Sequence, residues 1–387
     1  MFWSNFLETV GLLQLRVDQL GMIGVSFLLA YLGIKKKFEP LLLIPISFGM
    51  LMANMPLAGL DYQGVTWAGE PGLLAFIYSF IELVYLPPLI FLGLGAITDF
   101  SPLIANPKLW LIGIGGQLGI FSAFGLALLV GNVFGPIFPD LAFGANAAAS
   151  IAIIGSSDGP TAIYTTVMLY PGLLSVIAIA AYSYMALVPI IQPPIMRALT
   201  TAKERVIVME QPKQVTSRQK IFFPIVVATV VLLLAPAAGP LIGMFMLGNL
   251  IRESGVAERI AKAIGGDFLS ILTMLIGLCI GAASTAENIV NPRTIVIIVL
   301  GLLAFAFGTV GGVLMAKLLN VITGGKINPL IGNSGVSAMP MAARVSQKVA
   351  LEYNPNNFLI MHAMGCILAS TIGSAIVAGI FVAMLGG

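Results

Sequence analysis

Asp158 is the residue whose type and position most directly indicate chemistry. It lies in the motif Gly-Ser-Ser-Asp-Gly-Pro and is the only charged residue between Leu141 and Tyr170. A carboxylate inside a membrane costs roughly 2.5–3.5 kcal/mol on insertion scales, so it persists where it is paired or functional. The sequence offers no Lys or Arg within about thirty residues on either side. A hard cation such as sodium, bound by carboxylate, hydroxyl and carbonyl oxygens, fits this gap. A proton relay through the same carboxylate is the alternative.

Two related interruptions of apolar sequence support a binding site. The first break, residues 154–160, and the second break, residues 328–340, both contain Ile-Gly-(Ser/Asn)-Ser and both end on Pro. Gly and Pro leave backbone groups unpaired, which a membrane protein tolerates where the backbone lines a cavity or is packed in protein. Matched breaks in two halves are typical of transporters built from internal repeats. Glycine kinks that only help helices to pack are the alternative, but the Ser, Asn and Asp residues at the breaks favour a site.

Other polar residues in apolar sequence are weaker candidates. Tyr184 follows Tyr170 by about 21 Å of helix, which places it well inside the membrane. Its hydroxyl can donate to a carboxylate or carry a proton, and an interfacial anchor is the alternative. Glu82 is interpreted as a helix-end residue and His362 as a packed polar residue. The sequence has no Ser/His/Asp set, CxxC pair or phosphate loop, which excludes these common soluble enzyme classes.

The composition requires that membrane helices position these residues. The chain has 387 residues, of which 58% are hydrophobic and 9% charged, whereas soluble domains carry about 25% charged residues. Spans of about 20 apolar residues therefore fill the chain. We predict an all-α, polytopic membrane protein with about 10–11 helical segments. The net charge of +3 does not indicate nucleic-acid binding, because the basic residues cluster at the ends of apolar segments.

Charge and hydropathy divide the chain into four parts. Residues 1–19 are predicted to form an interfacial helix, and residues 20–196 a first membrane repeat that contains the first break. Residues 197–220 carry six Lys/Arg against two Glu, which predicts a cytoplasmic loop. Residues 221–387 are predicted to form a second, inverted membrane repeat that contains the second break.

Four motifs, in order, resemble one protein family. GSSDGPT, AYSYMALVPIIQPP, NPLIGNSGVSAMPMAARV and NFLIMHAMG are similar to the beta subunit of sodium-pumping biotin-dependent decarboxylases, which act on oxaloacetate, methylmalonyl-CoA, glutaconyl-CoA or malonate. The resemblance runs from about Leu20 to the C-terminus. It implies an elevator-like fold with scaffold and core parts, in the cytoplasmic (inner) membrane of a bacterium.

The resemblance also implies an activity. The family decarboxylates carboxybiotin, takes up a proton and exports sodium. Biotin arrives on a partner biotin carrier protein, because this chain has no biotin-accepting Met-Lys-Met. The other implied partners are a carboxyltransferase alpha subunit, a small single-span gamma or delta subunit and further copies of the chain. Activity is expected only with these partners.

Site residues follow from the same motifs. The resemblance implies sodium ligands at Asp158, Asn328, Gly332 and Ser337, to which the neighbouring Asn333 is added. Tyr184 or Ser337 would relay the proton, and Arg344 is a candidate partner for the carboxylate of carboxybiotin.

The sequence departs from the family pattern directly after the fourth motif. The family's MHAMG is often followed by Pro-Asn, whereas this sequence has Cys366-Ile367, which puts one sodium contact in doubt.

The second functional hypothesis is a sodium-coupled organic-anion transporter that uses the same two breaks but catalyses no decarboxylation, and a weaker third hypothesis is a membrane scaffold. The sequence does not name the acid substrate.

Overall fold

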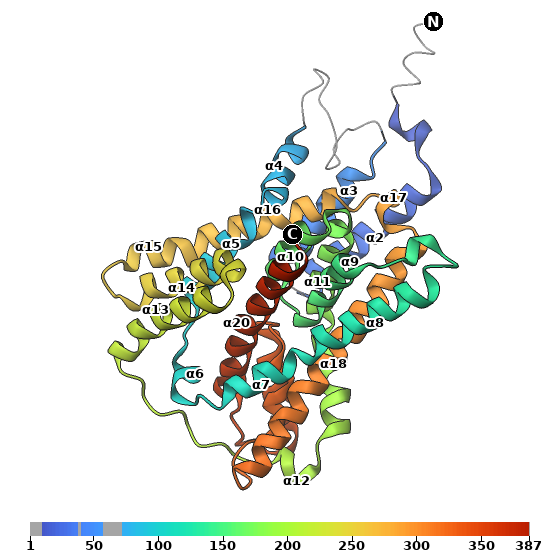
Figure 1. Ribbon diagram of the computed structural model, residues 1–387. Helices are drawn as coiled ribbons and strands as arrows, with labels where there is room; N and C mark the ends of the chain where they lie inside the picture. The colour runs from blue at the N-terminus through green and yellow to red at the C-terminus, as the bar shows by residue number, and fades with distance from the viewer. Residues whose placement is uncertain (1–9, 38–39, 57–71, 387) are drawn as a thin grey trace, which may run out of the picture.

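The structure, a computed structural model, describes residues 10–37, 40–56 and 72–386. These residues form helices and short helical turns and contain no strand (Figure 1). Six helical segments are long and apolar enough to cross a membrane, and two bent helix pairs raise the number to eight. The prediction of an all-α, multi-pass membrane protein is therefore confirmed. The six segments are Val17–Ile34, Leu109–Phe134, Ser217–Leu234, Glu258–Ala282, Pro292–Ile322 and Ile360–Leu385.

The N-terminal prediction is only partly covered by the described residues. Residues 1–9 lie outside them; Gly11–Gln14 form a 3₁₀ turn, and helix α2 (Val17–Ile34) begins three residues before the predicted start at 20. Most of the polar stretch around residues 61–72 also lies outside the described residues.

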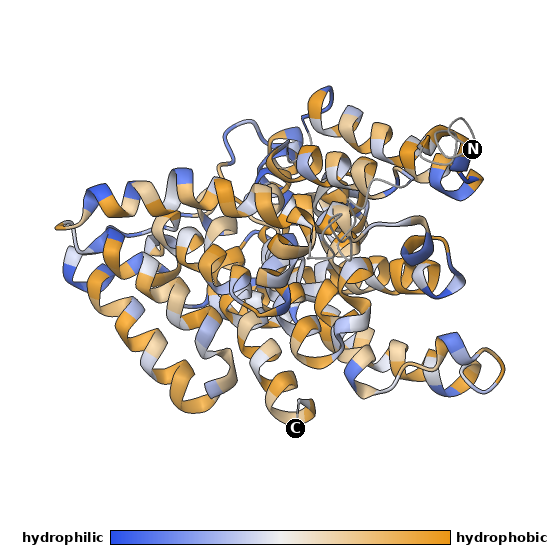
Figure 2. Ribbon diagram, turned by 90° about the horizontal axis from the view of Figure 1, so that it is seen from above, coloured by the Kyte–Doolittle hydropathy of each residue, from blue (hydrophilic) through white to orange (hydrophobic). Residues whose placement is uncertain are grey.

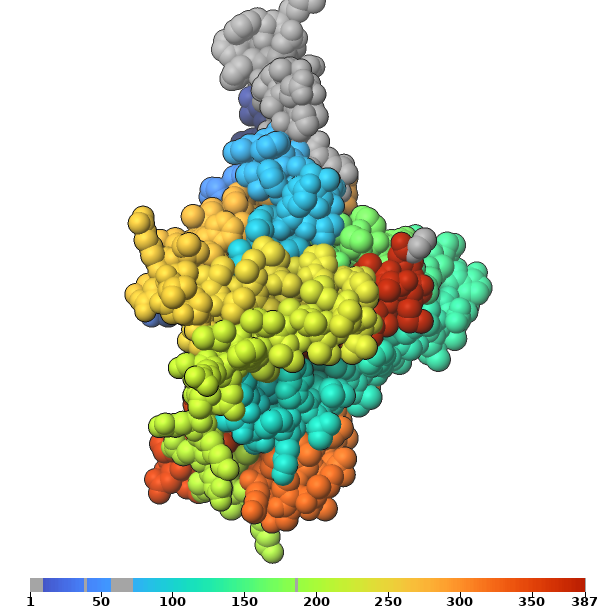
Figure 3. All heavy atoms as spheres, turned by 60° about the vertical axis from the view of Figure 1, so that its left-hand side comes forward, coloured from blue at the N-terminus to red at the C-terminus, as the bar shows by residue number. Residues whose placement is uncertain are grey.

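Eight helices make up what we call the peripheral group. In it, α3 packs along α16 and α5 packs along α14, while α2 covers α3 and α13 covers α14. Figure 3 shows α14 to α16 in yellow, covering one side of this group. The helices are α2, α3 (Pro40–Ala53), α4 (Leu73–Glu82), α5 (Leu86–Ile97), α13 (Ser217–Leu234), α14 (Gly239–Glu253), α15 (Glu258–Ala263) and α16 (Leu269–Ala282).

Glycines allow the two helix pairs of this group to cross closely. A Cβ on Gly49 of α3 would lie 2.3 Å from the carbonyl oxygen of Leu278, and one on Gly281 would lie 2.2 Å from that of Ile46. The α5–α14 crossing has the same design, because Gly95 and Gly248 face the partner backbone at 2.0 and 2.1 Å. Such close approach is how helices associate where no hydrophobic effect drives them together.

Eight other helices form what we call the central group, which contains both breaks, and the short helices α6 (Ser101–Ala105), α12 (Ala202–Arg205) and α17 (Ala286–Ile289) lie in the connections. Here α11 packs on α18, and α20 packs on α7. This pairing, like the α3–α16 and α5–α14 pairings of the peripheral group, joins a helix of the first half to one of the second. The elements are α7 (Leu109–Gly116), α8 (Leu118–Phe134), α9 (Ala145–Ala152), α10 (Gly159–Leu169), α11 (Leu174–Leu199), α18 (Pro292–Ile322), α19 (Met341–Tyr353) and α20 (Ile360–Leu385).

Residues 197–220 and the ends of α18 and α19 share one face of the molecule. Lys317 contacts Glu204 at 3.6 Å, and Arg197 contacts Glu352 at 2.6 Å. We call this the basic face. In Figure 2 hydrophobic residues cover the helices, and hydrophilic ones concentrate at their ends and in loops. That distribution is expected for helices whose sides face lipid.

Candidate functional site

The first break changes the chain direction and leaves Asp158 at the start of a new helix. Helix α9 ends at Ala152, a 3₁₀ turn covers Ile153–Ser156, and Ser157 adopts a left-handed conformation with φ 53°. Asp158 then caps α10, with Pro160 in the first helical turn, where proline is tolerated. Asp158 as a whole residue is 4% exposed.

Neutral groups surround the Asp158 carboxylate. Its Oδ2 accepts hydrogen bonds from the Thr161 hydroxyl at 2.7 Å and the Ser374 hydroxyl at 3.0 Å. Within the part of the chain that the structure describes, its Oδ1 accepts only the long, 3.4 Å bond from the Thr161 backbone N–H. Among the described residues, no Lys, Arg or His lies within ion-pair distance. A carboxylate offers about four acceptor positions, so this one retains capacity for a cation.

The second break meets the first. A 3₁₀ turn covers Pro329–Gly335, and α19 begins at Met341 after a non-helical segment. The Ser337 backbone N–H donates to the Ser156 carbonyl at 2.8 Å, which joins the breaks directly. The Ser337 hydroxyl donates to that of Ser370 at 3.2 Å. Since Ser370 and Ser374 are four residues apart on α20, they share a helix face, so α20 connects Ser337 to the Asp158 site.

The crossing of the breaks with α7 and α8 depends on glycine. A Cβ on Gly116 would lie 1.6 Å from the carbonyl oxygen of Gly335, and one on Gly155 would lie 2.9 Å from the backbone of Gly119. A side chain at either position would therefore require a backbone segment to move. The sequence left two interpretations of the breaks, close helix packing through glycine and a polar binding site. The structure has glycine packing at the same place as the polar cluster around Asp158.

Asp158 and Ser337 line a cavity of about 390 Å³ between the central and peripheral groups. The Tyr182 ring lies against Gly159, whose Cβ, if present, would be 2.7 Å from the Tyr182 hydroxyl. The lining extends to Leu41 and Ile97, which lie at the start of α3 and the end of α5. The complete lining is Leu41, Leu42, Ile90, Leu94, Ile97, Asp158, Pro160, Tyr182, Phe245, Gly265, Leu269, Ser270, Thr273, Ile276, Ser337, Met339, Pro340 and Thr371.

The other residues predicted for the second break lie outside this lining. Gly332 packs against α18, where a Cβ would lie 2.5 Å from the Gly312 carbonyl oxygen. The Asn333 side-chain amide donates to Gln192 at 2.7 Å and to the Ala342 carbonyl at 3.0 Å. These two residues hold the break in place.

Asn328, Tyr184 and Arg344 are also separate from the Asp158 carboxylate. The Asn328 amide donates to the backbone of the 197–220 loop, at Arg205 and Ile207. Tyr184 donates to the carbonyl of Ile298 on α18. Arg344 is exposed on α19, and its backbone N–H bonds to Pro340, which lines the cavity. Arg344 thus lies one helical turn from the cavity wall.

Several site residues were not identified from the sequence. Thr161, Ser374, Thr371 and Tyr182 contact Asp158 or line its cavity. The sequence contains a signal for the α20 residues, because three hydroxyl side chains occur at helical spacing in an otherwise apolar segment: Ser370, Thr371 and Ser374. For Thr161 the signal was its position three residues after a capping aspartate.

The fold and site together define a multi-pass helical membrane protein with a buried carboxylate at paired helix breaks. Residues 18–385 match the family described as the Na+-transporting oxaloacetate decarboxylase beta subunit. The chain is 50% identical to the methylmalonyl-CoA decarboxylase subunit beta of Veillonella parvula, over 99% of this chain and 97% of that protein. It is 47% identical to oxaloacetate decarboxylase beta chain 2 of Salmonella typhi, over 97% of each chain. The chain therefore belongs to the family of sodium-transporting decarboxylase beta subunits.

Proposed function

We propose that this chain decarboxylates carboxybiotin and couples the reaction to outward sodium transport with proton uptake. Membership of the family supports the decarboxylase role, and the Asp158 site supports sodium as the cargo. The observation that carries the proposal is a buried carboxylate held by two hydroxyls, without a cationic partner among the described residues, at the junction of the two breaks.

Sodium would bind at Asp158, with oxygen atoms of the two breaks as further ligands. The free acceptor capacity of Oδ1 and the hydroxyls of Thr161, Ser374 and Ser337 provide hard oxygen ligands. Ser374 can serve in this role because its Oγ lies 3.0 Å from both Asp158 and the Thr371 carbonyl. It can therefore donate to the carbonyl while its oxygen faces the ion. The ligand roles predicted for Gly332, Asn333 and Asn328 remain proposals that require a rearrangement of the second break.

Carboxybiotin would enter the cavity from the basic face. Its carboxylate would approach Arg344, which is exposed near the cavity wall and can form a bidentate pair. The N–C bond then breaks, carbon dioxide leaves, and the ureido nitrogen takes up a proton. Ser337 lines the cavity and can pass that proton directly. Tyr184 would need to release the Ile298 carbonyl to do so.

Partners and membrane orientation complete the proposal. The biotin would be delivered by a biotin carrier protein after a carboxyltransferase alpha subunit has loaded it, with a small single-span subunit and further copies of this chain in the assembly. The basic face would lie in the cytoplasm of a bacterium, because Lys and Arg are retained on that side of the inner membrane. The cavity lining would then reach toward the cytoplasm, because Lys220 contacts Asp99 at 3.6 Å, two residues beyond the lining residue Ile97.

The test is sodium-dependent decarboxylation of free carboxybiotin by membranes that carry the chain together with its partner subunits. Asp158→Asn should abolish the sodium-stimulated rate, whereas Asp140→Asn, which changes an exposed carboxylate on a 3₁₀ turn, should leave it intact. Equal sodium stimulation in both variants would remove Asp158 from the mechanism. Sodium-dependent uptake of a labelled organic anion, without any decarboxylation, would instead establish the transporter alternative.

A further inference from the structure

A polar pocket lies at the basic face, apart from the Asp158 cavity. Its volume is about 300 Å³, and it is lined by the start of α7, the loop after α18, the 197–220 loop and the start of α20. Lys108, Lys326, Asn106 and His362 contribute polar side chains, and Glu210 also lines it. The two lysines outnumber the one carboxylate, so the pocket is suited to an anion.

Groups in this pocket have unused hydrogen-bonding capacity. His362 is 4% exposed, and its Nδ1 is buried with no hydrogen-bond partner among the residues that the structure describes. Neither Lys108 nor Lys326 has a carboxylate within 4 Å among the described residues, whereas their neighbour Lys317 is paired with Glu204. An unpartnered buried polar atom is costly, and a ligand in this pocket would satisfy it.

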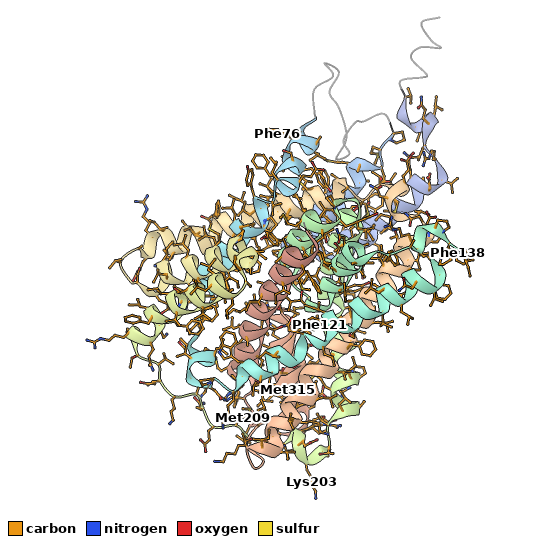
Figure 4. The ribbon with its side chains drawn as sticks, viewed as in Figure 1. Phe76, Phe121, Phe138, Lys203, Met209 and Met315 are labelled. Carbon is orange, nitrogen blue, oxygen red and sulfur yellow. The ribbon has the colours of Figure 1, made fainter. Side chains whose placement is uncertain are left out.

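An apolar groove lies further along the two elements whose ends border the pocket, α7 and α18. It lies between α7–α8 and α18, has a volume of about 440 Å³, and its lining includes Ile114, Leu118, Phe121, Leu314 and Met315. Ile114 is six residues beyond Lys108, which is about 9 Å of helix. In Figure 4, Met209 of the pocket and then Met315 and Phe121 of the groove lie in sequence from the basic face upward. Figure 3 shows the cyan α7 region just above the orange end of α18.

We propose that this pocket and groove bind one anionic glycerophospholipid. The phosphate lies between Lys108 and Lys326 within reach of Asn106 and His362, and an acyl chain lies in the groove between α7–α8 and α18. The charge of the pocket selects an anion, and the groove, which starts about 9 Å further along α7, selects a lipid over a soluble phosphate. Outer walls that face the membrane, such as Leu314 at 47% exposure and Leu118 at 48%, are suited to an acyl chain.

The test measures thermal stabilisation of the purified complex in detergent by added phosphatidylglycerol. Phosphatidylcholine is the headgroup control, and glycerol phosphate tests whether the acyl chains matter. The variants are Lys108→Gln, Lys326→Gln and the two combined; Lys203→Gln, at the far tip of the same face (Figure 4), is the matched control. Leu314→Trp fills the groove without changing the pocket.

Phosphatidylglycerol should stabilise the wild type, and each pocket variant should weaken its apparent affinity about fivefold. Lys203→Gln should retain the wild-type affinity, and Leu314→Trp should lose affinity for the lipid. Equal stabilisation by phosphatidylcholine, or by glycerol phosphate at matched concentration, overturns the proposal. Copurification of a membrane-spanning polypeptide that protects the groove in place of lipid overturns it as well. If the double variant does not fold, the apparent affinities of the two single-lysine variants for phosphatidylglycerol are compared with that of Lys203→Gln.

Discussion

Replacing Gly116 by Ala should separate the two breaks. The added Cβ would lie 1.6 Å from the carbonyl oxygen of Gly335, whereas ordinary contact begins at 3.4 Å. One of the two segments must therefore retreat by about 1.8 Å, the difference between these distances. Gly335 is two residues before Ser337, which holds Ser156 through a 2.8 Å hydrogen bond, so a retreat of the second break by this distance would break the bond between the breaks.

The cost can be estimated from these contacts. Overpacking costs about 1–3 kcal/mol, and each buried polar group left without its partner costs about 1–3 kcal/mol more. We expect a loss of at least about 3 kcal/mol, or a fall in melting temperature of about 6 °C at roughly 2 °C per kcal/mol. Sodium-stimulated decarboxylation should fall about 100-fold or more, because a displacement of about 1 Å at a reacting site has that effect.

Gly125→Ala is the matched control, because it makes the same change on the same membrane span. Nothing lies within 4 Å of a Cβ at Gly125. Alanine favours a helix interior over glycine by about 1 kcal/mol, so this variant should be as stable as the wild type or more so. Melting curves in detergent and sodium titrations of the rate compare the two variants. A Gly116→Ala protein with the stability and rate of Gly125→Ala would refute the geometry of the crossing.

Three other substitutions test separate parts of the structure. Gln192→Leu should cost about 2–4 kcal/mol, because it leaves the Asn333 backbone carbonyl and one of the two N–H donors of the Asn333 side-chain amide without their partner; a melting temperature equal to that of the wild type would contradict this. Tyr182→Phe keeps the ring against Gly159 and removes only the hydroxyl, so sodium titrations should show weaker half-saturation with a change of about 1 kcal/mol or less in stability. At the basic face, burial acts to raise the pKa of Glu204, but hydrogen bonds from Thr201 and the nearby ammonium of Lys317 lower it below its usual value. This carboxylate stabilises the folded state above the unfolded pKa of about 4.3, and the contribution is lost as pH falls through the lower folded pKa. Glu204→Gln should therefore flatten the fall in melting temperature below about pH 4.5, by less than about 1 kcal/mol, and an unchanged profile would exclude the effect.

The membrane character and the breaks were predictable because they depend on local composition. Asp158 stands out as a charge in apolar sequence, and Gly with Pro marks the interruptions. The direct contact between Ser156 and Ser337 follows from neither break alone, although repeat symmetry made their proximity a reasonable expectation. Helix ends differ by a few residues, as at Val17, because hydropathy does not fix a helix start.

The detailed shell around Asp158 was harder to predict. Ser374 is 216 residues away in sequence from Asp158, and only the packing of α20 against α10 brings the two together. Tyr182 and Tyr184 are two residues apart, so the sequence could not show which one faces the cavity. Helix rotation decides this, because residues two apart point to different sides of a helix. The family resemblance implies that Asn328 is a sodium ligand. In this structure, however, its side-chain amide donates to the backbone of the 197–220 loop.

That loop attachment has a mechanical consequence. Asn328 and Asn357 both donate to the same two carbonyls, those of Arg205 and Ile207. The 197–220 loop is thus hydrogen-bonded to the segments on both sides of α19. A displacement of α19 would therefore move the 197–220 loop as well. The affinity of a protein bound to the 197–220 loop would therefore depend on the position of the second break, and its binding would in turn favour one position of that break.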